Sequence, residues 1–226
     1  MDVPRSPHRW SVTPQQASAI QRRLASLVRQ VPLGCAPRLV AGLDAAFSHD
    51  ERRCLAAVVL WDMREQTVIE QRVAVRPLTF PYVPGLLSFR EGPAVLAALR
   101  KLRVSPDVLI YDGHGLAHPR RFGIACHVGV ILNRPTIGCA KSRLIGTHRE
   151  PGSTRGSAAP LIDDGEVIGS VLRTRDGINP VFVSVGHLID LRAAQQVVLA
   201  CAIRHRLPEP TRIADQLAGA AKRATG

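Results

Sequence analysis

The chain has 226 residues, and its 30 Lys and Arg against 18 Asp and Glu give a formal net charge of +12. Hydrophobic residues make up 46% of it, which excludes a disordered chain and provides a core for a single α/β domain over residues 1–226. The positive charge favours an anionic partner, nucleic acid first, because Lys and Arg neutralise phosphates. A basic protein from an arginine-rich proteome is the alternative interpretation.

Cysteine usage and hydropathy indicate the cellular compartment of the protein. The five cysteines are odd in number and form no CxxC pair, which disfavours a zinc site or a disulfide framework and predicts a reducing, cytoplasmic setting. No apolar run approaches the roughly 18 residues of a membrane span, and residues 1–10 lack the apolar core of a signal peptide. We therefore expect no membrane association, and a monomer by default.

The first predicted elements are one helix and three strands. Thr13 is expected to cap a helix over residues 15–29, with Pro14 at the first helical position. Three apolar runs joined by short polar connections then predict an antiparallel meander, with strands at 38–47, 54–61 and 67–75.

A stiff loop and a second helix follow the meander. The loop at 77–85 contains three prolines and is expected to expose its aromatic side chains. Ser88 and Glu91 have the spacing of a capping box, which predicts a helix from Ser88 to about Arg103.

The second half of the chain predicts further strands and helices. A strand at 108–111 is expected to run parallel to its neighbour, because a helix precedes it. The remaining predicted elements, in chain order, are a buried helix at 122–132, a strand at 136–140, a mobile loop at 146–160, strands at 167–174 and 181–185, a helix at 188–204 and a last helix from a Thr211 cap through Lys222. The β-β-β-α-β-α-β order predicts a ribonuclease H-like mixed sheet, three antiparallel strands followed by parallel strands, flanked by helices.

Two apolar runs within the predicted strands are each followed directly by an aspartate. Asp112 follows the run at 108–111 and precedes Gly-His-Gly, and Asp44 follows a similar run at 39–43. Carboxylates at the C-terminal ends of strands lie where such sheets bind ligands, and the fold order adds Glu91 from the helix between them. Oxygen ligands of this kind suit Mg²⁺, with Mn²⁺ as a substitute, and metal-assisted cleavage of a phosphodiester.

Each of the other catalytic candidates has a structural alternative. Glu91 also fits a simple capping role. His118 and its neighbour His114 offer a proton source that titrates near neutrality, although at least one of the two is expected to make a structural turn hydrogen bond. Lys141 follows a strand and is predicted to face the scissile phosphate, if it is not a surface lysine. Asp215 is interpreted as stabilising the start of the last helix through the dipole, or else as a fourth acidic ligand.

Tyr82 stands in the proline-rich segment Pro81-Tyr82-Val83-Pro84-Gly85. A rigid aromatic tip can wedge between bases and hold a duplex open while a neighbouring nucleotide is flipped. The alternative is a connection whose tyrosine packs on the core.

Five segments, in this order, resemble the endonuclease V family, the deoxyinosine 3′ endonucleases. They cover the chain from about residue 13 to 222 and are Gly42-Leu43-Asp44, the Tyr82 loop, Phe89-Arg90-Glu91-Gly92-Pro93, the segment from Asp112 to Arg120 and the segment from Arg206 to Arg212. The resemblance implies a Mg²⁺-dependent DNA repair nuclease of ribonuclease H-like fold that recognises hypoxanthine in single- or double-stranded DNA. It implies a cut at the second phosphodiester on the 3′ side of the lesion, leaving 3′-hydroxyl and 5′-phosphate ends.

The resemblance also implies a role for each candidate residue. Asp44, Asp112 and Glu91 would be the metal ligands, and Asp215 an accessory metal or water contact. Lys141 and His118 would serve the phosphate. Tyr82 would be the wedge, and the flipped base would enter a pocket formed largely by backbone groups. The lesion-binding residues would be Tyr82, Pro84, Gly85, Leu87, Gly113 and Ile124.

The chain departs from the family in places, and other functions remain open. Phe47 stands where the family often has tyrosine, and residues 146–160 are less similar. Some family members prefer inosine in RNA, so an inosine-specific ribonuclease is one alternative. Another ribonuclease H-like metal nuclease acting on branched or mismatched DNA is a second. A non-catalytic DNA-binding protein is disfavoured, because clustered carboxylates repel phosphate in the absence of a cation.

Overall fold

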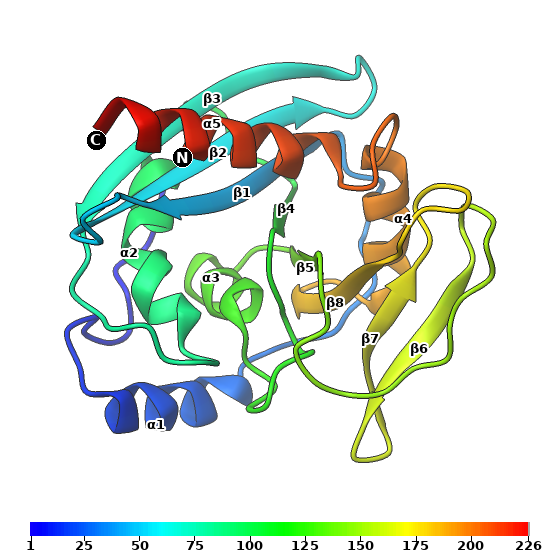
Figure 1. The fold of residues 1–226 in the computed structure, drawn as a ribbon, viewed down its shortest axis with the longest axis horizontal. Helices are drawn as coiled ribbons and strands as arrows, with labels where there is room; N and C mark the ends of the chain where they lie inside the picture. Colours follow the sequence, from blue (N-terminus) through cyan, green and yellow to red (C-terminus); the bar gives the residue numbers. More distant parts are fainter. Residues whose placement is uncertain (226) are drawn as a thin grey trace.

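The protein is described here by a computed structural model, whose described residues are 1–225. Its strands form one sheet in the order β3-β2-β1-β4-β5-β8-β7-β6 (Figure 1). The strands are β1 (Leu39–Phe47), β2 (Arg53–Asp62), β3 (Thr67–Pro77), β4 (Val108–Tyr111), β5 (Thr136–Ala140), β6 (Ala158–Asp163), β7 (Glu166–Leu172) and β8 (Val181–His187). The helices are α1 (Pro14–Ala25), α2 (Leu87–Arg100), α3 (Ile124–Leu132), α4 (Leu191–Cys201) and α5 (Glu209–Thr225).

The register of the central strands positions the carboxylates. β1, β2 and β3 pair as the predicted antiparallel meander, and β4 runs parallel to β1, which confirms the mixed sheet. Leu43 of β1 lies opposite Tyr111 of β4, and the backbone N–H of Asp112 donates to the carbonyl of Leu43 at 3.1 Å. Asp44 and Asp112 are the next residues along these two strands, so they emerge side by side.

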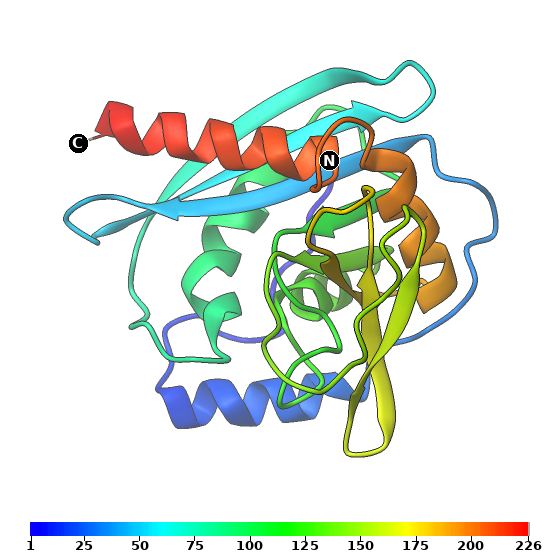
Figure 2. The ribbon, with the colours of Figure 1, turned by 45° about the vertical axis from the view of Figure 1, so that its right-hand side comes forward.

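Helices cover both faces of the sheet (Figures 1 and 2). Alternate residues of β2 face opposite ways: Leu55, Ala57 and Val59 on one side, Cys54, Ala56 and Val58 on the other, as the two-residue period of a strand requires. The side with Cys54, Ala56 and Val58 packs with α2 and α3 in the largest apolar cluster. The opposite side packs with α5, and α4 covers β5 and β8. Across residues 1–225, we find no helix that is both long and apolar enough to cross a membrane.

Two predicted helix caps are wrong. α2 begins at Leu87 after an N-cap at Leu86 that makes no side-chain cap hydrogen bond, so Ser88 lies inside the helix and there is no capping box. α5 begins at Glu209, and the Thr211 hydroxyl donates to the Pro208 carbonyl at 2.9 Å. In both helices the expected cap residue turns its hydroxyl inward, and neither hydroxyl is needed to start the helix.

Other differences concern the ends of elements and one missed strand. α1 ends at Ala25 and not near residue 29, and α4 begins at Leu191 after an Asp190 cap. The loop predicted at 146–160 runs into β6, an edge strand whose pairing with β7 shifts register between Leu161 and Ile162. Proline and small residues weaken the strand pattern there, and an edge position tolerates both. The Arg173 guanidinium also binds this segment, through Glu150 and the carbonyls of Pro151 and Gly152.

A pair of histidines, one half-buried and one buried, ties the N-terminal segment to α3. His8 Nδ1 lies 2.8 Å from the Arg9 carbonyl, and His8 Nε2 lies 2.6 Å from His127 Nε2. A carbonyl only accepts, so His8 Nδ1 carries a proton, and with both rings neutral His127 Nε2–H donates to His8 Nε2. Trp10 and Phe89 pack around the two rings, and the lowered pKa values of the two histidines favour the neutral form. Burial lowers the pKa of both histidines, and that of His127 falls well below its ordinary value.

The histidine pair predicts a pH dependence of stability. A His with a lowered folded-state pKa contributes stability that is complete above its unfolded pKa near 6.5 and is lost as pH falls through that value. At pH 5.5 the loss from His127 is on the order of 1 kcal/mol. Chemical denaturation at pH 7.5 and 5.5 should show a smaller loss in His127→Leu than in the wild type, by about that amount. An exposed-site control, His49→Asn, should lose as much stability between pH 7.5 and 5.5 as the wild type does. An equal loss in all three proteins would contradict the assignment.

Candidate active site

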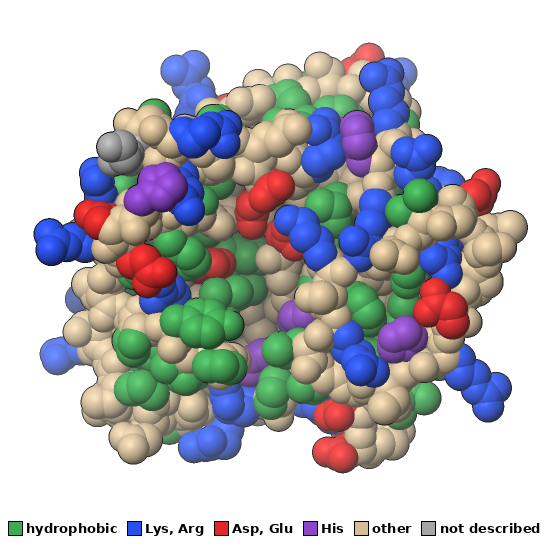
Figure 3. Space-filling view, in the orientation of Figure 1, with side chains coloured by type: hydrophobic (Ala, Val, Ile, Leu, Met, Phe, Trp, Pro, Cys, Tyr) green, Lys and Arg blue, Asp and Glu red, His purple; other side chains and the backbone are tan. Residues whose placement is uncertain are grey.

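Carboxylates from three elements meet on one face of the molecule. Asp44 comes from β1, Asp112 follows β4, and Asp215 lies on α5 beyond its first turn. Asp44 and Asp215 share a hydrogen bond, and Lys141 Nζ lies 2.6 Å from Asp112 Oδ2 and 3.7 Å from Asp215 Oδ1. Figure 3 shows acidic side chains grouped near the centre of this face with basic ones beside them. Asp215 thus joins the cluster, and the interpretation as a helix-dipole residue is wrong.

The close approach of α5 to β1 explains how Asp215 reaches the cluster. A Cβ at Gly42 would lie 2.1 Å from the carbonyl carbon of Pro210, so no larger residue fits there. With glycine at that position, the start of α5 lies directly on β1. The next turn of α5 then carries Asp215 over Asp44, two residues along the strand from Gly42.

The cluster holds more negative charge than its burial favours. Burial raises the pKa of Asp44, and the neighbouring Asp112 and Asp215 raise it further. Burial also raises the pKa of Asp112, although the hydrogen bond and charge of Lys141 oppose that change. For Lys141, burial by itself would lower the pKa, but Asp112, Asp215 and Asp44 raise it, so the ammonium stays charged. One cation is thus built into the cluster, and further positive charge would be stabilised there.

Glu91 lies behind this cluster and is held by a tyrosine. The Tyr111 hydroxyl donates to Glu91 Oε2 at 2.5 Å, and both side chains are buried. Burial raises the pKa of Glu91 to about 7 against the opposing hydrogen bond from Tyr111, and the charge of Asp112 adds to the rise. This contact replaces the predicted capping role. Next to it, the Arg90 guanidinium lies 4.4 Å from the ring centroid of Phe47, a cation–π contact at the position where the family often has tyrosine.

A cavity of about 160 Å³ opens beside the carboxylates, since Gly113 of its lining directly follows Asp112. All six residues predicted to bind the lesion line this cavity: Tyr82, Pro84, Gly85, Leu87, Gly113 and Ile124. Tyr82 is 71% exposed, so it does not pack on the core, whereas Phe80 of the same loop is buried, contrary to the expectation that its aromatic residues are exposed. The cavity therefore has a free aromatic side chain at its edge.

Three donors converge on the carbonyl of Gly85 in the cavity wall. They are Arg120 Nη2 at 2.7 Å, His118 Nε2 at 2.9 Å and Gln21 Nε2 at 3.1 Å. His118 Nδ1 accepts from the Arg120 backbone N–H at 3.1 Å, so Nε2 carries the proton and the ring is neutral. Burial lowers the pKa of His118 to about 4. Both its nitrogens are engaged within the wall, so His118 lies with the pocket and not with the carboxylates.

Sequence reasoning missed several residues of the site. Gln21 is buried on α1 with Ala17 and Leu24, and this spacing along one helical face was a signal that could have found it. His114, named from the sequence as a possible proton source, was not missed: it lines the cavity, and burial lowers its pKa to about 4 despite a hydrogen bond with the Ser142 backbone. Nothing in the sequence indicated the bond from Tyr111 to Glu91, because a buried strand tyrosine looks like any other core residue.

The donor set fits a hard divalent cation in its chemistry. Across residues 1–225, no group of three or more His, Cys, Asp and Glu side chains stands ready-made to hold a metal ion. Asp44 and Asp112, which are half-buried, and Glu91, which is buried, nevertheless offer carboxylate oxygen atoms, the ligands that Mg²⁺ and Mn²⁺ prefer. The raised pKa values of these groups indicate carboxylates that a bound cation would stabilise in the charged form.

The comparison with known proteins decides the family. The Endonuclease V family model matches residues 22–216. This chain belongs to the endonuclease V family. Endonuclease V of a Roseiflexus species is 52% identical over 209 residues, covering 92% of this chain and 93% of that protein. Nucleases of the endonuclease V family generally need a divalent metal, which agrees with the donor set.

Solved structures of endonuclease V have the same fold. The Streptomyces avermitilis enzyme superposes with a TM-score of 0.92 at 44% identity, with both chains fully covered. A Ciona intestinalis endonuclease V, solved in complex with a 23mer DNA containing an inosine followed by a ribo-adenosine, gives a TM-score of 0.83 at 26% identity, over 95% of this chain and 100% of that one. The mixed sheet and its flanking helices are therefore those of an endonuclease V.

The bond between Tyr111 and Glu91 should stabilise both the fold and the metal site. Tyr111→Phe leaves a buried carboxylate without its donor and should lower the free energy of unfolding by about 1–3 kcal/mol. Titration of the folded protein with Mg²⁺ should also show weaker binding, because Glu91 loses the contact that fixes its orientation. The matched control is Tyr82→Phe, whose hydroxyl is exposed and which should keep wild-type stability. A Tyr111→Phe protein as stable as that control would contradict the role.

The conformation of Gly85 should be required for the pocket. Its φ is +76°, and a Cβ there would lie 2.8 Å from Arg120 Nη2. Gly85→Ala should therefore cost about 1 kcal/mol for the backbone, and more for the displaced guanidinium. The control, Gly156→Ala, has φ +89° with nothing within 4 Å of the added Cβ, so it isolates the backbone cost. Equal destabilisation of the two variants in urea unfolding would show that the contact with Arg120 is unimportant.

Proposed function

We propose that this endonuclease V cuts DNA at deoxyinosine, the product of adenine deamination, as a repair enzyme. The cut is the hydrolysis of the second phosphodiester on the 3′ side of the lesion, which leaves 3′-hydroxyl and 5′-phosphate ends. The observation that supports this function best is the small cavity that opens directly beside three carboxylates. The inosine-containing DNA bound to the Ciona relative supports the choice of base.

The cavity supports recognition of one flipped base. Its wall combines apolar side chains with backbone groups of Gly85, Gly113 and Gly123, and backbone N–H and C=O groups read a base edge without needing mobile side chains. Gln21, His118 and Arg120 hold the Gly85 carbonyl in place, so this part of the wall is set before a base arrives. The role that we assign to His118 is thus to shape the pocket.

Tyr82 is suited to the role of a wedge. It is 71% exposed, and the prolines at 81 and 84 restrict the backbone on either side of it. An exposed ring on a stiff loop can take the place of a base that has left the stack, which offsets part of the cost of flipping it.

The carboxylates and Lys141 would act on the phosphate. Asp44, Asp112 and Glu91 would hold Mg²⁺, with Mn²⁺ as a substitute, and the bound ion would activate water and neutralise charge at the phosphate. Lys141 keeps its ammonium charged beside Asp112, so it can donate to a phosphate oxygen. Asp215 orients Asp44 by their hydrogen bond and pairs with Lys141.

We further propose a cytoplasmic monomer, a setting in which the five free cysteines would stay reduced.

The decisive test is a nicking assay on a 5′-labelled duplex with one deoxyinosine, run with Mg²⁺ and with EDTA beside an adenine control and an inosine RNA. We expect a Mg²⁺-dependent cut one nucleotide beyond the lesion, absent from the adenine control. Asp112→Asn should remove the nicking and retain the binding, while Asp164→Asn, an exposed turn residue, should match the wild type. Cleavage of the RNA alone would transfer the function to inosine RNA, and nicking by Asp112→Asn at the wild-type rate would refute its role.

Tyr82→Ala should weaken binding to the deoxyinosine duplex by about tenfold, the order of the loss of one stacked base. Binding to a single strand with an unstacked deoxyinosine should change less, because no duplex must be held open. Fluorescence anisotropy in EDTA measures both affinities without cleavage. An equal loss on the two substrates would argue against a wedge and in favour of a simple stacking contact.

A further inference from the structure

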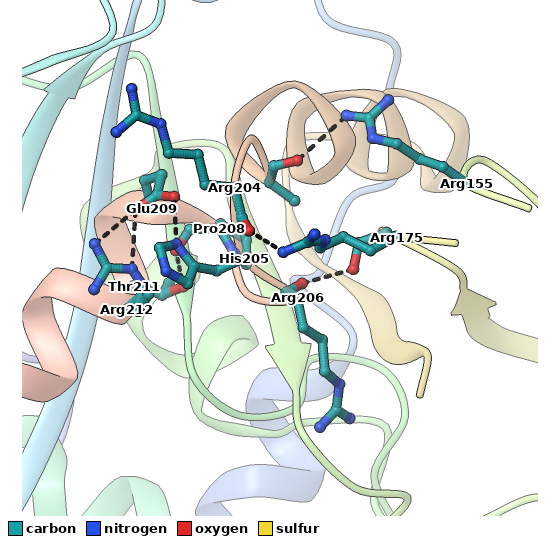
Figure 4. A network of polar contacts seen from close by, with 11 residues as sticks. Arg155, Arg175, Arg204, His205, Arg206, Pro208, Glu209, Thr211 and Arg212 are labelled. Atoms are coloured by element: carbon teal, nitrogen blue, oxygen red, sulfur yellow. Dashed lines mark hydrogen bonds and ion pairs between the residues drawn. The ribbon is translucent and has the colours of Figure 1, made fainter. Parts of the chain in front are cut away.

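Four arginines from three separate segments gather at the connection between α4 and α5 (Figure 4). Arg155 precedes β6, Arg175 follows β7, and Arg204 and Arg206 lie between the two helices. Arg155, Arg175 and Arg204 are exposed, and Arg206 is half-buried. We call these four residues the arginine ridge.

Backbone carbonyls hold three of the four guanidinium groups of the ridge, those of Arg155, Arg175 and Arg206. Arg155 Nη2 donates to the carbonyls of Leu199 at 2.6 Å and Ala202 at 3.3 Å, and Arg175 Nη1 donates to the carbonyl of Arg204. Arg206 Nη2 donates to the carbonyls of Lys141 at 2.6 Å and Pro180 at 2.7 Å. A carbonyl fixes the position of a guanidinium without neutralising its charge, so these three groups are held in place and remain positive.

Several other arginines of the protein pair with carboxylates. Arg38 pairs with Asp62, Arg121 with Asp163 and Arg173 with Glu150. Within residues 1–225, by contrast, no ridge arginine forms an ion pair with a carboxylate. Of two carboxylates in the region, Asp176 accepts the backbone N–H of Arg155, so its charge lies at the ridge, and Glu209 pairs with Arg212 and His205. The four arginines of the ridge therefore outnumber the carboxylate beside them, and its net charge is positive.

The ridge adjoins the carboxylate cluster on the side of Lys141. Arg206 binds the carbonyl of Lys141, whose Nζ contacts Asp112, and the charge of Arg206 opposes the rise in the pKa of Asp112. Figure 3 shows the central acidic group between a hollow lined by His and apolar side chains below it and basic side chains above and to its right. A strand that starts with a base in the cavity and crosses the carboxylates would meet the ridge next.

We propose that the arginine ridge binds the phosphate backbone of the DNA on the 3′ side of the cut. The assignment rests on the proposed function, since the cut lies 3′ to the base in the pocket and the chain direction of the substrate follows from that. Guanidinium groups with several N–H donors suit phosphate oxygens, and each contact releases counterions and adds about 0.9 to the salt dependence of binding. The ridge thus gives affinity for the arm beyond the cut without reading its sequence.

The test uses Arg175→Gln/Arg204→Gln, which leaves Lys141 and Arg206 intact. Three deoxyinosine duplexes serve as probes: one long on both sides, one shortened just beyond the cut on the 3′ side, and one shortened on the 5′ side. In EDTA, the double variant should bind the long and 5′-shortened duplexes about tenfold more weakly, with a salt slope lower by about 1.8 for two lost contacts. Its affinity for the 3′-shortened duplex should equal that of the wild type, and its nicking rate at saturating protein should be unchanged.

The matched control is Arg64→Gln/Arg103→Gln, which removes equal charge at the opposite ends of β1 and β4 from the carboxylates. It should bind all three duplexes as the wild type does. Equal losses of affinity in both double variants, or a loss of affinity for the 3′-shortened duplex, would overturn the assignment of the ridge to the 3′ arm. Either outcome would leave the proposed function standing. If the wild type neither binds nor nicks deoxyinosine DNA in preference to the adenine control, the proposed function fails and the 3′ assignment fails with it.

Discussion

The parallel pairing of β1 with β4 is the constraint on which the site depends. Because Leu43 lies opposite Tyr111, one hydrogen bond from the Asp112 backbone to the Leu43 carbonyl places two aspartates at the same edge of the sheet. A shift of register by one residue would turn one of them to the other face. The apolar side chains of both strands oppose such a shift, since it would expose residues of the core. The packing of the core thus holds together two like charges that would otherwise separate.

Tyr111 joins the base pocket to the carboxylate cluster. Its hydroxyl binds Glu91, and a Cβ at Gly113 would lie 3.2 Å from its ring, so the ring also supports the pocket wall. Ile124 closes in on Gly113 from the other side. A base and a cation bound as we propose would therefore be separated by one rigid, buried side chain. A displacement of the pocket wall would therefore move the Tyr111 ring and, with it, the Glu91 carboxylate.

Sequence could predict the order of the sheet, because alternating apolar runs and short connections identify β1–β3 and the crossover through α2 identifies β4 as parallel. It predicted the lesion-pocket residues through their resemblance to a family. It failed where a tertiary contact overrides a local pattern: Ser88 and Thr211 have capping sequences but lie inside helices, and Asp215 looked like a dipole residue until α5 was placed on β1. β6 was missed because edge strands need only one partner and tolerate proline.

The close contact of Gly42 with Pro210 has a consequence for biosynthesis. Asp215 belongs to α5, which follows every strand of the sheet in the chain, and it reaches Asp44 only after α5 lies on β1. A nascent chain can complete the sheet and the pocket while the acidic cluster still lacks this member. Assembly of the cluster is thereby linked to the arrival of α5, so the growing polypeptide gains its full set of acidic groups only after α5 has left the ribosome.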